Sequence, residues 1–290
     1  MSVLDRIKKM HQILDDTFQL QLDEAMAALL TGPKYQDPKN LNRYERRVFS
    51  QTGEDGIIGE IFRRIGATNK LFVECAPGNG LESNSLYLMT RGWTGLWIEA
   101  NSKHAHTIRT SFSKQLKEGA LTLQNQLVTA DSIEPILDKA SLQAEFDLLS
   151  IDIDRNDYWI WRSIQRYHPR VVVIEYNAIW PPDCNWVVEY EPQASWDKTS
   201  NCGASLNALE LLGAEKGYQL VGCTLAGTNA FFVREDLTAD HFQKPSTAEN
   251  HYEPPRYYLT LRKAGHRRAV PHGKEHVGDR NSKRAATAPL

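Results

Sequence analysis

The sequence predicts an α/β protein with a mainly parallel sheet, and three observations indicate this fold class. Short apolar segments alternate with segments of helical periodicity over residues 54–176. A turn containing Gly78 and Gly80 follows the first apolar segment, and Glu99 ends the second one about twenty residues later. Two apolar segments within residues 218–234 are separated by so few residues that they must pair antiparallel.

The composition is that of one large domain without membrane or nucleic-acid features. The chain has 290 residues, of which 41% are apolar, and its net charge of -2 gives no reason to invoke nucleic acid or an anionic membrane. No run of 18 apolar residues occurs. The 4 cysteines lack CxxC spacing, which argues against a zinc site or a disulfide framework. We therefore expect a soluble, cytoplasmic protein with reduced thiols.

Three regions are expected along the chain. Residues 1–45 form a helical extension, because apolar residues recur at helical spacing from Val3 to Leu30 before the Gly32-Pro33 break. Residues 46–260 form the α/β domain. Residues 261–290 hold eight Lys or Arg against two acids without apolar periodicity, which predicts a disordered basic tail. The first helix could be a lid or the contact of a homodimer.

The helices of the domain are placed by periodicity and by their end signals. Gly66, Gly92 and Gly217 stand where helices are expected to stop, and Asn101 is a typical N-cap. Asp131 is expected to cap a short helix. The full set of expected helices is 54–65, 82–91, 101–112, a short helix after residue 131, 157–167 and 204–216.

The strands are placed by short runs rich in β-branched and aromatic residues. They are expected at residues 71–75, 95–99, 120–128, 146–152, 171–176, 218–224 and 229–234. Strands that alternate with helices at this spacing predict a parallel sheet with right-handed crossovers. Between the fifth strand and the next helix lies a loop, residues 177–202, which is rich in Pro, Trp and Tyr, and a loop of that length is usually functional or a lid.

Five parallel strands that end in a helix and an antiparallel hairpin are the layout of Rossmann-like class I methyltransferases, which use S-adenosylmethionine (SAM). A dinucleotide dehydrogenase would instead repeat the βαβ half. The third glycine of the dinucleotide fingerprint would fall at position 83, which is Ser83. The layout therefore favours SAM over NAD as the nucleotide.

A nucleotide site is indicated beside the first turn. Gly78 and Gly80 let the backbone N–H groups approach a ligand, and Glu99 stands where a carboxylate can bind ribose hydroxyls. Glu74, in the first strand, could face the amino-acid end of the cofactor or pair with a basic side chain. Asp131 could accept a hydrogen bond from an adenine amino group, serve as the N-cap, or do both.

Acidic residues gather at the ends of the fourth and fifth strands. Asp152 and Asp154 follow one strand and Glu175 ends the next, so all three should converge at the carboxyl edge of the sheet. A carboxylate of raised pKa, Asp154 or Glu175, could be a general base toward a hydroxyl. Alternatively, these acids with Asn177 could bind Mg²⁺, although such an all-oxygen set is not a specific signature and we expect no metal. Helix capping and salt bridges are the structural alternative.

Several stretches together resemble the FkbM-type methyltransferases or a close relative of them. The likeness covers about residues 45–260 and rests on the combination of motifs. The motifs are SQTGEDG at 50–56, FVECAPGNG at 72–80, GWTGLWIE at 92–99, SIDIDRNDYW at 150–159, VVVIEYN at 171–177, GASL at 203–206 and NAFFVR at 229–234.

The resemblance implies a class I fold, SAM as the methyl donor and a hydroxyl acceptor on a small molecule or glycan. It implies that Glu74, Gly78, Gly80 and Glu99 contact SAM, that Gln51 and Asp55 are further candidate contacts, and that Asp152, Asp154 and Asn156 border the acceptor cleft. The implied activity is a SAM-dependent O-methyltransferase.

The chain departs from the family pattern at two informative positions. Ala76 replaces the first glycine of the turn, which is a mild change as long as its φ is negative. Arg155 replaces the glycine that usually follows the second acid, so its guanidinium could neutralise the acids, bind an acidic substrate or fill the site. A catalytically silent SAM-fold binding or scaffold protein is therefore the alternative function.

Overall fold

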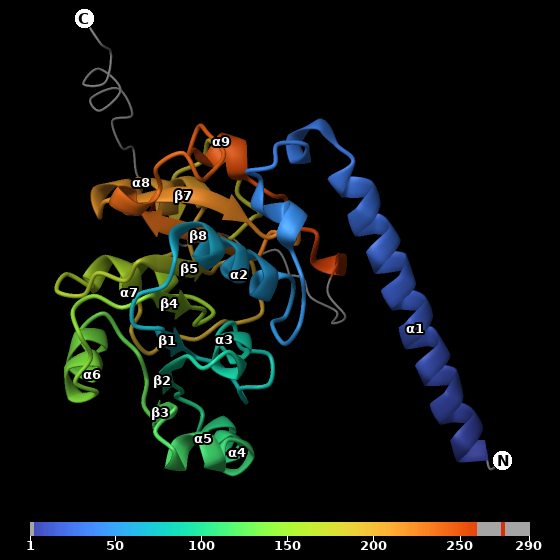
Figure 1. The fold of residues 1–290 in the computed structure, drawn as a ribbon, viewed down its shortest axis with the longest axis horizontal. Helices are drawn as coiled ribbons and strands as arrows, with labels where there is room; N and C mark the ends of the chain where they lie inside the picture. The colour runs from blue at the N-terminus through green and yellow to red at the C-terminus, as the bar shows by residue number, and fades with distance from the viewer. Residues whose placement is uncertain (1–2, 260–273, 276–290) are drawn as a thin grey trace, which may run out of the picture.

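A seven-stranded sheet forms the centre of the molecule in the computed structural model, which describes residues 3–259 and 274–275. The strand order is β3-β2-β1-β4-β5-β8-β7, in which the first five strands run parallel and β8 is antiparallel to both β5 and β7. This order, with its single reversed strand, is the Rossmann-like class I methyltransferase fold that the hairpin predicts. Figure 1 shows the sheet with helices on both sides.

The strands coincide with the expected ones, though several are shorter. They are β1 (Leu71–Cys75), β2 (Thr94–Ile98), β3 (Leu121–Gln124), β4 (Leu148–Ile151), β5 (Val171–Glu175), β7 (Tyr218–Cys223) and β8 (Asn229–Arg234). Within the long loop, β6 (Trp186–Val187) pairs antiparallel with β9 (Lys274–Glu275), a pairing that the sequence did not predict. The remaining residues of the expected basic tail lie outside the described part of the chain.

The helices likewise follow the expected order. They are α1 (Val3–Leu30), α2 (Glu54–Ile65), α3 (Leu86–Thr90), α4 (Ser102–Ser111), α5 (Ser113–Lys117), α6 (Ile133–Lys139), α7 (Asp157–Ser163), α8 (Leu206–Glu215) and α9 (Ala248–His251), with short 3-10 turns at Pro33–Tyr35, Leu41–Tyr44, Glu235–Leu237 and Tyr257–Leu259. Asn101 caps α4 as expected, with its side chain accepting from the N–H groups of Lys103 and His104. Asp131 does not cap α6, because Ser132 occupies that position.

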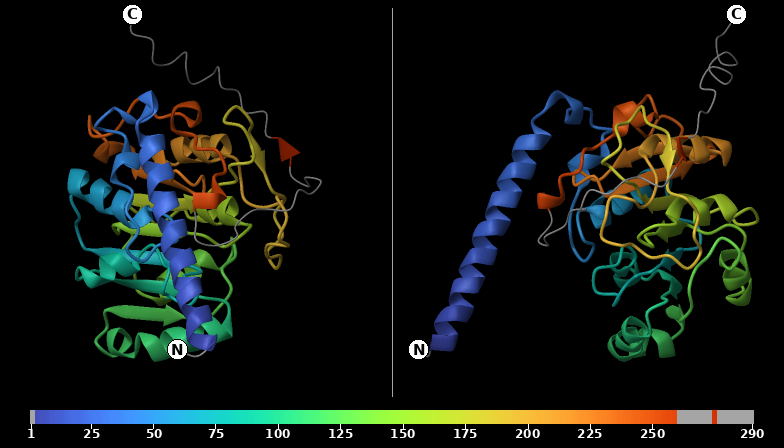
Figure 2. Two further views of the ribbon diagram at one scale, coloured as in Figure 1. Left: turned by 90° about the vertical axis from the view of Figure 1, so that its right-hand side faces the viewer. Right: turned by 180° about the vertical axis from the view of Figure 1, so that it is seen from behind.

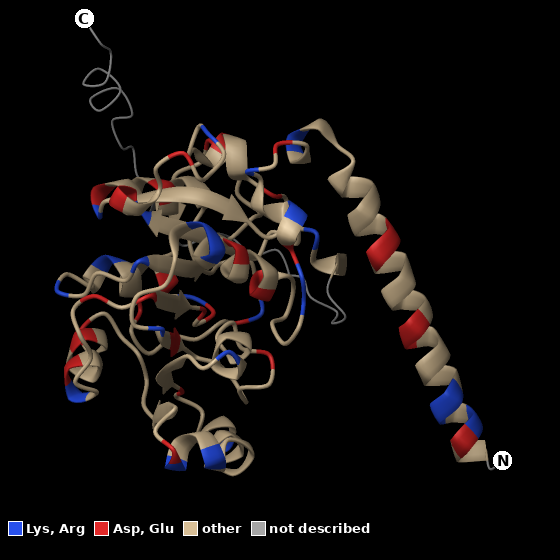
Figure 3. Cartoon of the chain, viewed as in Figure 1, with Lys and Arg blue, Asp and Glu red and all other residues tan. Residues whose placement is uncertain are grey.

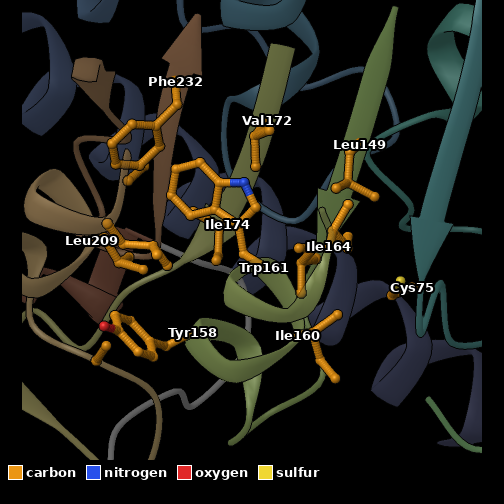
Figure 4. Packing of buried hydrophobic residues seen from close by; sticks show 14 of the residues in the cluster. Cys75, Leu149, Tyr158, Ile160, Trp161, Ile164, Val172, Ile174, Leu209 and Phe232 are labelled. Atoms are coloured by element: carbon orange, nitrogen blue, oxygen red, sulfur yellow. The ribbon is translucent and has the colours of Figure 1, made fainter. Parts of the chain in front are cut away.

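Each face of the sheet has its own apolar core because side chains alternate along every strand. On one face, the strands pack against α6, α7 and α8, and Trp161 of α7 lies 4.8 Å from Phe232 of β8 between ring centroids. Figure 4 shows this packing around Trp161. On the other face, Phe72 and Trp97 pack against α2, α3 and α4. The two cores leave the carboxyl edge of the parallel strands free for polar side chains.

Helix α1 is the exception to this compact arrangement. It leaves the domain and extends away from it (Figures 1 and 2), and Leu22 is its one buried residue within the described chain. Its C-terminal part packs on Tyr35, Leu225 and Leu259 through Leu22 and partly buried neighbours. The predicted bounds of this helix agree with the structure, but its exposed position was not predicted.

Candidate functional site

A pocket of about 360 Å³ opens at the carboxyl ends of β1, β2 and β4. We call it the Glu99 pocket. It is lined by Ala76, Gly78, Ile98, Glu99, Ala100, Asn101, His104, Gln126, Leu127, Val128, Ile153, Asp154, Asn156 and residues 192–195 of the long loop. Ligands of open α/β sheets bind at this edge, and the volume is within the range of small-molecule sites, about 300–1,000 Å³.

Glu99 offers a carboxylate oxygen to whatever enters this pocket. Its Oε1 accepts the N–H of Asn101 at 2.7 Å, which fixes the side chain. Its Oε2 is buried and makes no hydrogen bond with the described residues. Burial raises the pKa of Glu99, an effect opposed by the Asn101 N–H, by His104 and by the Gly78 N–H. A buried acceptor without a partner is costly, so a ligand with hydroxyl donors fits this position.

The turn after β1 is shaped by Glu74 and Gly80. Glu74 accepts hydrogen bonds from the N–H of Asn84 at 2.8 Å and from the N–H and hydroxyl of Ser85, so it organises the segment before α3. This arrangement explains why α3 begins at Leu86 rather than at residue 82. Gly80 has a φ of +82°, and a Cβ there would lie 2.6 Å from Trp97. Glu74 therefore supports the turn and does not line the Glu99 pocket.

Ala76 and Gly78 border the pocket with left-handed backbone. The φ of Ala76 is +55° and that of Gly78 is +60°. The condition for a mild substitution at Ala76, a negative φ, is therefore not met, and the alanine holds a conformation that favours glycine. Its N–H nevertheless donates to the carbonyl of Ile98 at 2.8 Å, so the turn keeps its connection to β2.

The segment after β3 lines the Glu99 pocket, but with other residues than Asp131, which the sequence predicted. Gln126, Leu127 and Val128 line the Glu99 pocket, whereas Asp131 is exposed and is not among the lining residues. Strand β3 ends at Gln124, four residues earlier than predicted, so the chain passes the pocket before it reaches Asp131. Gln126, not Asp131, is therefore the polar side chain of this segment that borders the pocket.

Asp152, Asp154 and Glu175 meet beside the Glu99 pocket, as their strand positions predicted, and we call them the acidic cluster. Each has a carboxylate oxygen within 4.8 Å of the others. Asp152 and Glu175 are half-buried, whereas Asp154 is exposed, lines the pocket and has a φ of +66°. Three such oxygens could hold a cation, but acidic groups of this kind also occur without one.

Burial raises the pKa of every member of the acidic cluster. For Asp152, burial is the largest cause and the charges of Asp154 and Asp157 add to it. Burial and the neighbouring acids likewise raise the pKa of Glu175 well above its usual value. Asp154 is exposed, but desolvation by the surrounding protein still raises its pKa. Burial raises the pKa of nearby Asp157 to about 7. Protons, a metal ion or a cationic ligand would relieve this repulsion.

Arg155 neither fills the pocket nor neutralises the acidic cluster. Its Nη2 donates to Glu191 Oε1 at 2.8 Å and its Nη1 donates to the carbonyl of Asn201 at 3.2 Å. The next residue, Asn156, donates its side-chain amide to the carbonyl of Glu191 at 2.9 Å. Both side chains therefore hold the long loop, whose residues 192–195 form one wall of the Glu99 pocket.

Asn177 also holds the loop, so its amide is not free for the metal-binding role considered from the sequence. Its amide donates to the carbonyls of Ser200 and Cys202, at 2.8 and 3.0 Å, and its Oδ1 accepts the N–H of Ile179. The loop aromatics pack internally, for example Trp180 on Trp186 with ring centroids 4.8 Å apart. Another loop aromatic, Tyr190, packs on Trp159 of α7 with ring centroids 5.8 Å apart.

Gln51 and Asp55 are separated by the structure. Three backbone N–H groups, of Val48, Phe49 and Ser50, donate to Asp55 Oδ2 at 2.6–2.9 Å, so this carboxylate holds the segment before α2. Asp55 lines a hollow of about 590 Å³ that runs along α2 and α3, away from the Glu99 pocket. Gln51 is exposed and borders a small cavity that also touches Asp152.

Sequence reasoning missed Glu54 and Asn229, which border the same small cavity as Gln51. The amide of Asn229 donates to Glu54 Oε1 at 2.9 Å, and its Oδ1 is buried without a partner among the described residues. Asn229 pairs with Glu175 across β5 and β8, so the antiparallel register could have placed it beside the acidic cluster. For Glu54 and for the pocket residues Gln126 and His104, no local sequence signal pointed to the site.

Comparisons with known proteins found similarity at low sequence identity. No family profile and no curated protein sequence matches the chain. Among solved structures, a putative O-methyltransferase from Klebsiella pneumoniae is 16% identical over 74% of this chain and 96% of its own, with a TM-score of 0.42. The N-terminal domain of EvdMO1, solved with SAH and D-fucose, is 15% identical over 62% of this chain and 80% of its own, with a TM-score of 0.39.

A third neighbour is the O-methyltransferase TomG from Streptomyces achromogenes in complex with SAM. It is 16% identical over 56% of this chain and 75% of its own, with a TM-score of 0.36. The strand order shows that this protein has the Rossmann-like class I methyltransferase fold. Within the described residues, no helix combines the length and the apolar character needed to cross a membrane.

Proposed function

We propose that the protein is a SAM-dependent O-methyltransferase that acts on a hydroxyl of a small molecule or glycan. The observation that carries this proposal is Glu99 Oε2, a buried carboxylate oxygen without a described partner in a pocket at the carboxyl edge of the sheet. A ribose offers hydroxyl donors that could bind this oxygen. Gln126, Leu127 and Val128 would then lie along the base, and the backbone around Gly78 along the sugar.

When bound, SAM would supply a methyl group on a positively charged sulfur. The acidic cluster is suited to a cationic cofactor, because a positive charge offsets the repulsion among Asp152, Asp154 and Glu175. Glu74 holds the turn and also borders the small cavity beside Asp152, so it remains a candidate contact. Gln51 borders the cavity beside Asp152 and remains a candidate contact, whereas Asp55 and Asp131 are not included.

Asp154 is the proposed general base toward the acceptor hydroxyl. It is the exposed member of the acidic cluster and lines the Glu99 pocket, so an acceptor can reach it. The surrounding protein partly desolvates its carboxylate and so raises its pKa, which brings it closer to the range in which a carboxylate accepts a proton efficiently. Asp152 and Glu175 would share protons or the cofactor's positive charge and keep Asp154 ionised.

The family-level resemblance supports the same function. The FkbM-like motifs carry the turn at residues 72–80, the carboxylate Glu99 and the acidic cluster, and these are the parts that border the pocket. The alternative, a catalytically silent SAM-fold scaffold, is motivated by Ala76 and Arg155. The orientation of Arg155 toward Glu191 removes one reason for that alternative, since its guanidinium leaves the pocket open.

The test is isothermal titration with SAM and with its demethylated product, followed by transfer of labelled methyl from SAM to a panel of hydroxyl acceptors. We expect binding at micromolar concentration and label on at least one acceptor. Binding without transfer to any acceptor would favour the scaffold. In that case Asp154→Asn should leave the affinity for SAM unchanged, because Asp154 would have no catalytic role. Absence of binding by both ligands would end the proposal.

A further inference from the structure

Helix α1 carries an apolar stripe that runs past the edge of the domain. Leu22, Ala25, Met26 and Leu29 pack on the body at the C-terminal end of the helix. The same side of the helix continues toward the N-terminus through Leu4, Ile7, Leu14 and Phe18, which are 61%, 44%, 60% and 38% exposed. These four residues recur at spacings of three, four or seven, which is the repeat of a coiled-coil seam.

A helix in this position needs a partner for its apolar side. At 1.5 Å per residue, the part of α1 before Leu22 projects roughly 28 Å from its last buried contact. Isolated helices of that length are marginal in water, and most helical stability in proteins comes from packing of the apolar face. Within the described residues, nothing is packed against Leu4, Ile7 or Leu14.

The charges of α1 indicate what the partner is. The first third of the helix holds three basic residues, Arg6, Lys8 and Lys9, against one acid, Asp5. Among charged residues, the remainder holds only acids, namely Asp15, Asp16, Asp23 and Glu24. Figure 3 shows the basic residues as blue near the N-terminus and the later acidic residues as red further along the helix, with one more red band at the N-terminal end from Asp5. Two copies that pair in parallel would place like charges together, whereas two antiparallel copies would place basic thirds against acidic ones.

We propose that α1 is a self-association element that pairs antiparallel with α1 of a second copy of this chain. With Phe18 opposite Ile7 of the second copy, Leu14 faces His11 and the apolar stripe is covered on both helices. In this register Lys8 lies beside Asp15 of the second copy on the flank of the seam. Because an antiparallel pair has two-fold symmetry, each such contact occurs twice.

An anionic membrane is the less favoured occupant. The helix from Val3 to Leu30 carries five acidic residues against three Lys or Arg. Helices that lie on anionic membranes instead have polar faces rich in Lys and Arg. The proposal is independent of the methyltransferase function, because it concerns a helix that does not border the Glu99 pocket.

The experiment measures the mass of the full-length protein in solution by light scattering and sedimentation at micromolar concentration. We expect a dimer, and we expect the double variant Leu14→Asp/Phe18→Asp to be a monomer with an unchanged unfolding midpoint of the domain. The matched control is Ile13→Asp/Leu20→Asp, since both residues are exposed, at 54% and 59%, on the other side of the helix. This control should remain dimeric.

Charge exchange tests the direction of the pairing. Lys8→Glu alone and Asp15→Lys alone should each weaken the dimer by several-fold, and the combined variant Lys8→Glu/Asp15→Lys should restore it. A dimer that the combined variant fails to restore would overturn the antiparallel register. A monomeric wild-type protein would overturn the proposal. If that monomer binds vesicles of phosphatidylserine and phosphatidylcholine, a membrane is the partner of α1 instead.

Discussion

Arg155 Nη2 donates to Glu191 Oε1 across 2.8 Å, although the two residues are 36 positions apart in the chain. The Arg155 side chain is 6% exposed and that of Glu191 is 60% exposed, so the guanidinium is fixed in the protein and the carboxylate reaches it from the loop. This ion pair joins the end of β4 to the wall of the Glu99 pocket formed by residues 192–195. Arg155, which differs from the FkbM-type pattern at this position, therefore connects the sheet to the long loop.

Replacement of Arg155 by Met should loosen that wall and weaken SAM binding. Hydrogen bonds to charged groups contribute about 1.5–3 kcal/mol, and solvent around Glu191 reduces this. We therefore expect the Kd for SAM, measured by titration calorimetry, to rise about tenfold, which corresponds to about 1.4 kcal/mol. The control Arg166→Met breaks an exposed ion pair with Glu134 and should leave the Kd unchanged. Equal Kd values for Arg155→Met and wild type would contradict the prediction.

Replacement of Glu99 by Ala should have the largest effect on cofactor affinity. The variant loses the acceptor proposed for two ribose hydroxyls, each charge-assisted hydrogen bond being worth about 1.5–3 kcal/mol. A rise in Kd of about 100-fold or more is expected in the same calorimetric titration, with Glu99→Gln intermediate because it keeps one carbonyl oxygen. Glu118→Gln, at the C-terminal end of α5, is the control. Retained affinity in Glu99→Ala would show that the ribose lies elsewhere.

Asp157 should make stability depend on pH near neutrality. Its pKa is raised by burial to about 7, above the value of about 3.9 in an unfolded chain. The folded protein therefore holds this proton more tightly, and the resulting stabilisation is complete below pH ~4 and is lost as the pH rises through ~7. Between about pH 5 and about pH 8, the wild type should therefore lose stability relative to Asp157→Asn.

The measurement for Asp157 is the free energy of unfolding by denaturant at several pH values in that window. Asn keeps an Oδ1 acceptor for the N–H of Ile153, which Asp157 binds at 2.8 Å, so the local structure should persist. Asp138→Asn is the control, because Arg166 lowers the pKa of Asp138 and its titration falls at lower pH. A constant difference between wild type and Asp157→Asn would refute a raised pKa at this site.

Removal of divalent cations should leave methyl transfer intact. The three oxygens of the acidic cluster could coordinate an ion, but Asn177, the fourth ligand considered, is engaged with Ser200 and Cys202. Raised pKa values allow protons to neutralise the cluster instead. The assay compares initial rates with EDTA and with added Mg²⁺. Loss of activity in EDTA that Mg²⁺ restores would establish a metal-dependent enzyme.

Gly80→Ala should destabilise the fold far more than Gly119→Ala. Both glycines have positive φ, +82° and +74°, so the backbone cost of about 1–2 kcal/mol is shared. Only at Gly80 would the new Cβ meet Trp97 at 2.6 Å, whereas Gly119 faces open space. Overpacking adds about 1–3 kcal/mol. Denaturant unfolding of the two variants measures this difference, and equal losses would mean that the Trp97 side chain can move aside.

The sequence was most informative where local chemistry repeats along the chain. The alternation of strands and helices, the bounds of α1 and the antiparallel pairing of β7 with β8 follow from periodicity and loop length, and the structure confirms them. The convergence of Asp152, Asp154 and Glu175 also follows, because the carboxyl ends of neighbouring parallel strands meet at one edge. These features depend on near neighbours or on simple topology.

Other features could not be read from local patterns. Asp131 and Gln126 are five residues apart, and only the early end of β3 places Gln126 at the pocket and Asp131 in solvent. The partner of Arg155 lies in a long loop whose path no periodicity describes. Ala76 has a positive φ in a turn where its N–H donates to the carbonyl of Ile98 on β2, a contact between different strands that no local pattern encodes.

The amino-acid sequence by itself determined the order of elements, the strand that reverses direction and the edge of the sheet at which acids gather, since these depend on periodicity, turn length and chain connectivity. The tertiary structure alone decided which carboxylate keeps a free oxygen, where Arg155 points and which part of α1 is left uncovered. Those outcomes depend on contacts between residues far apart in the chain, and burial and hydrogen-bond partners exist only once the chain has folded.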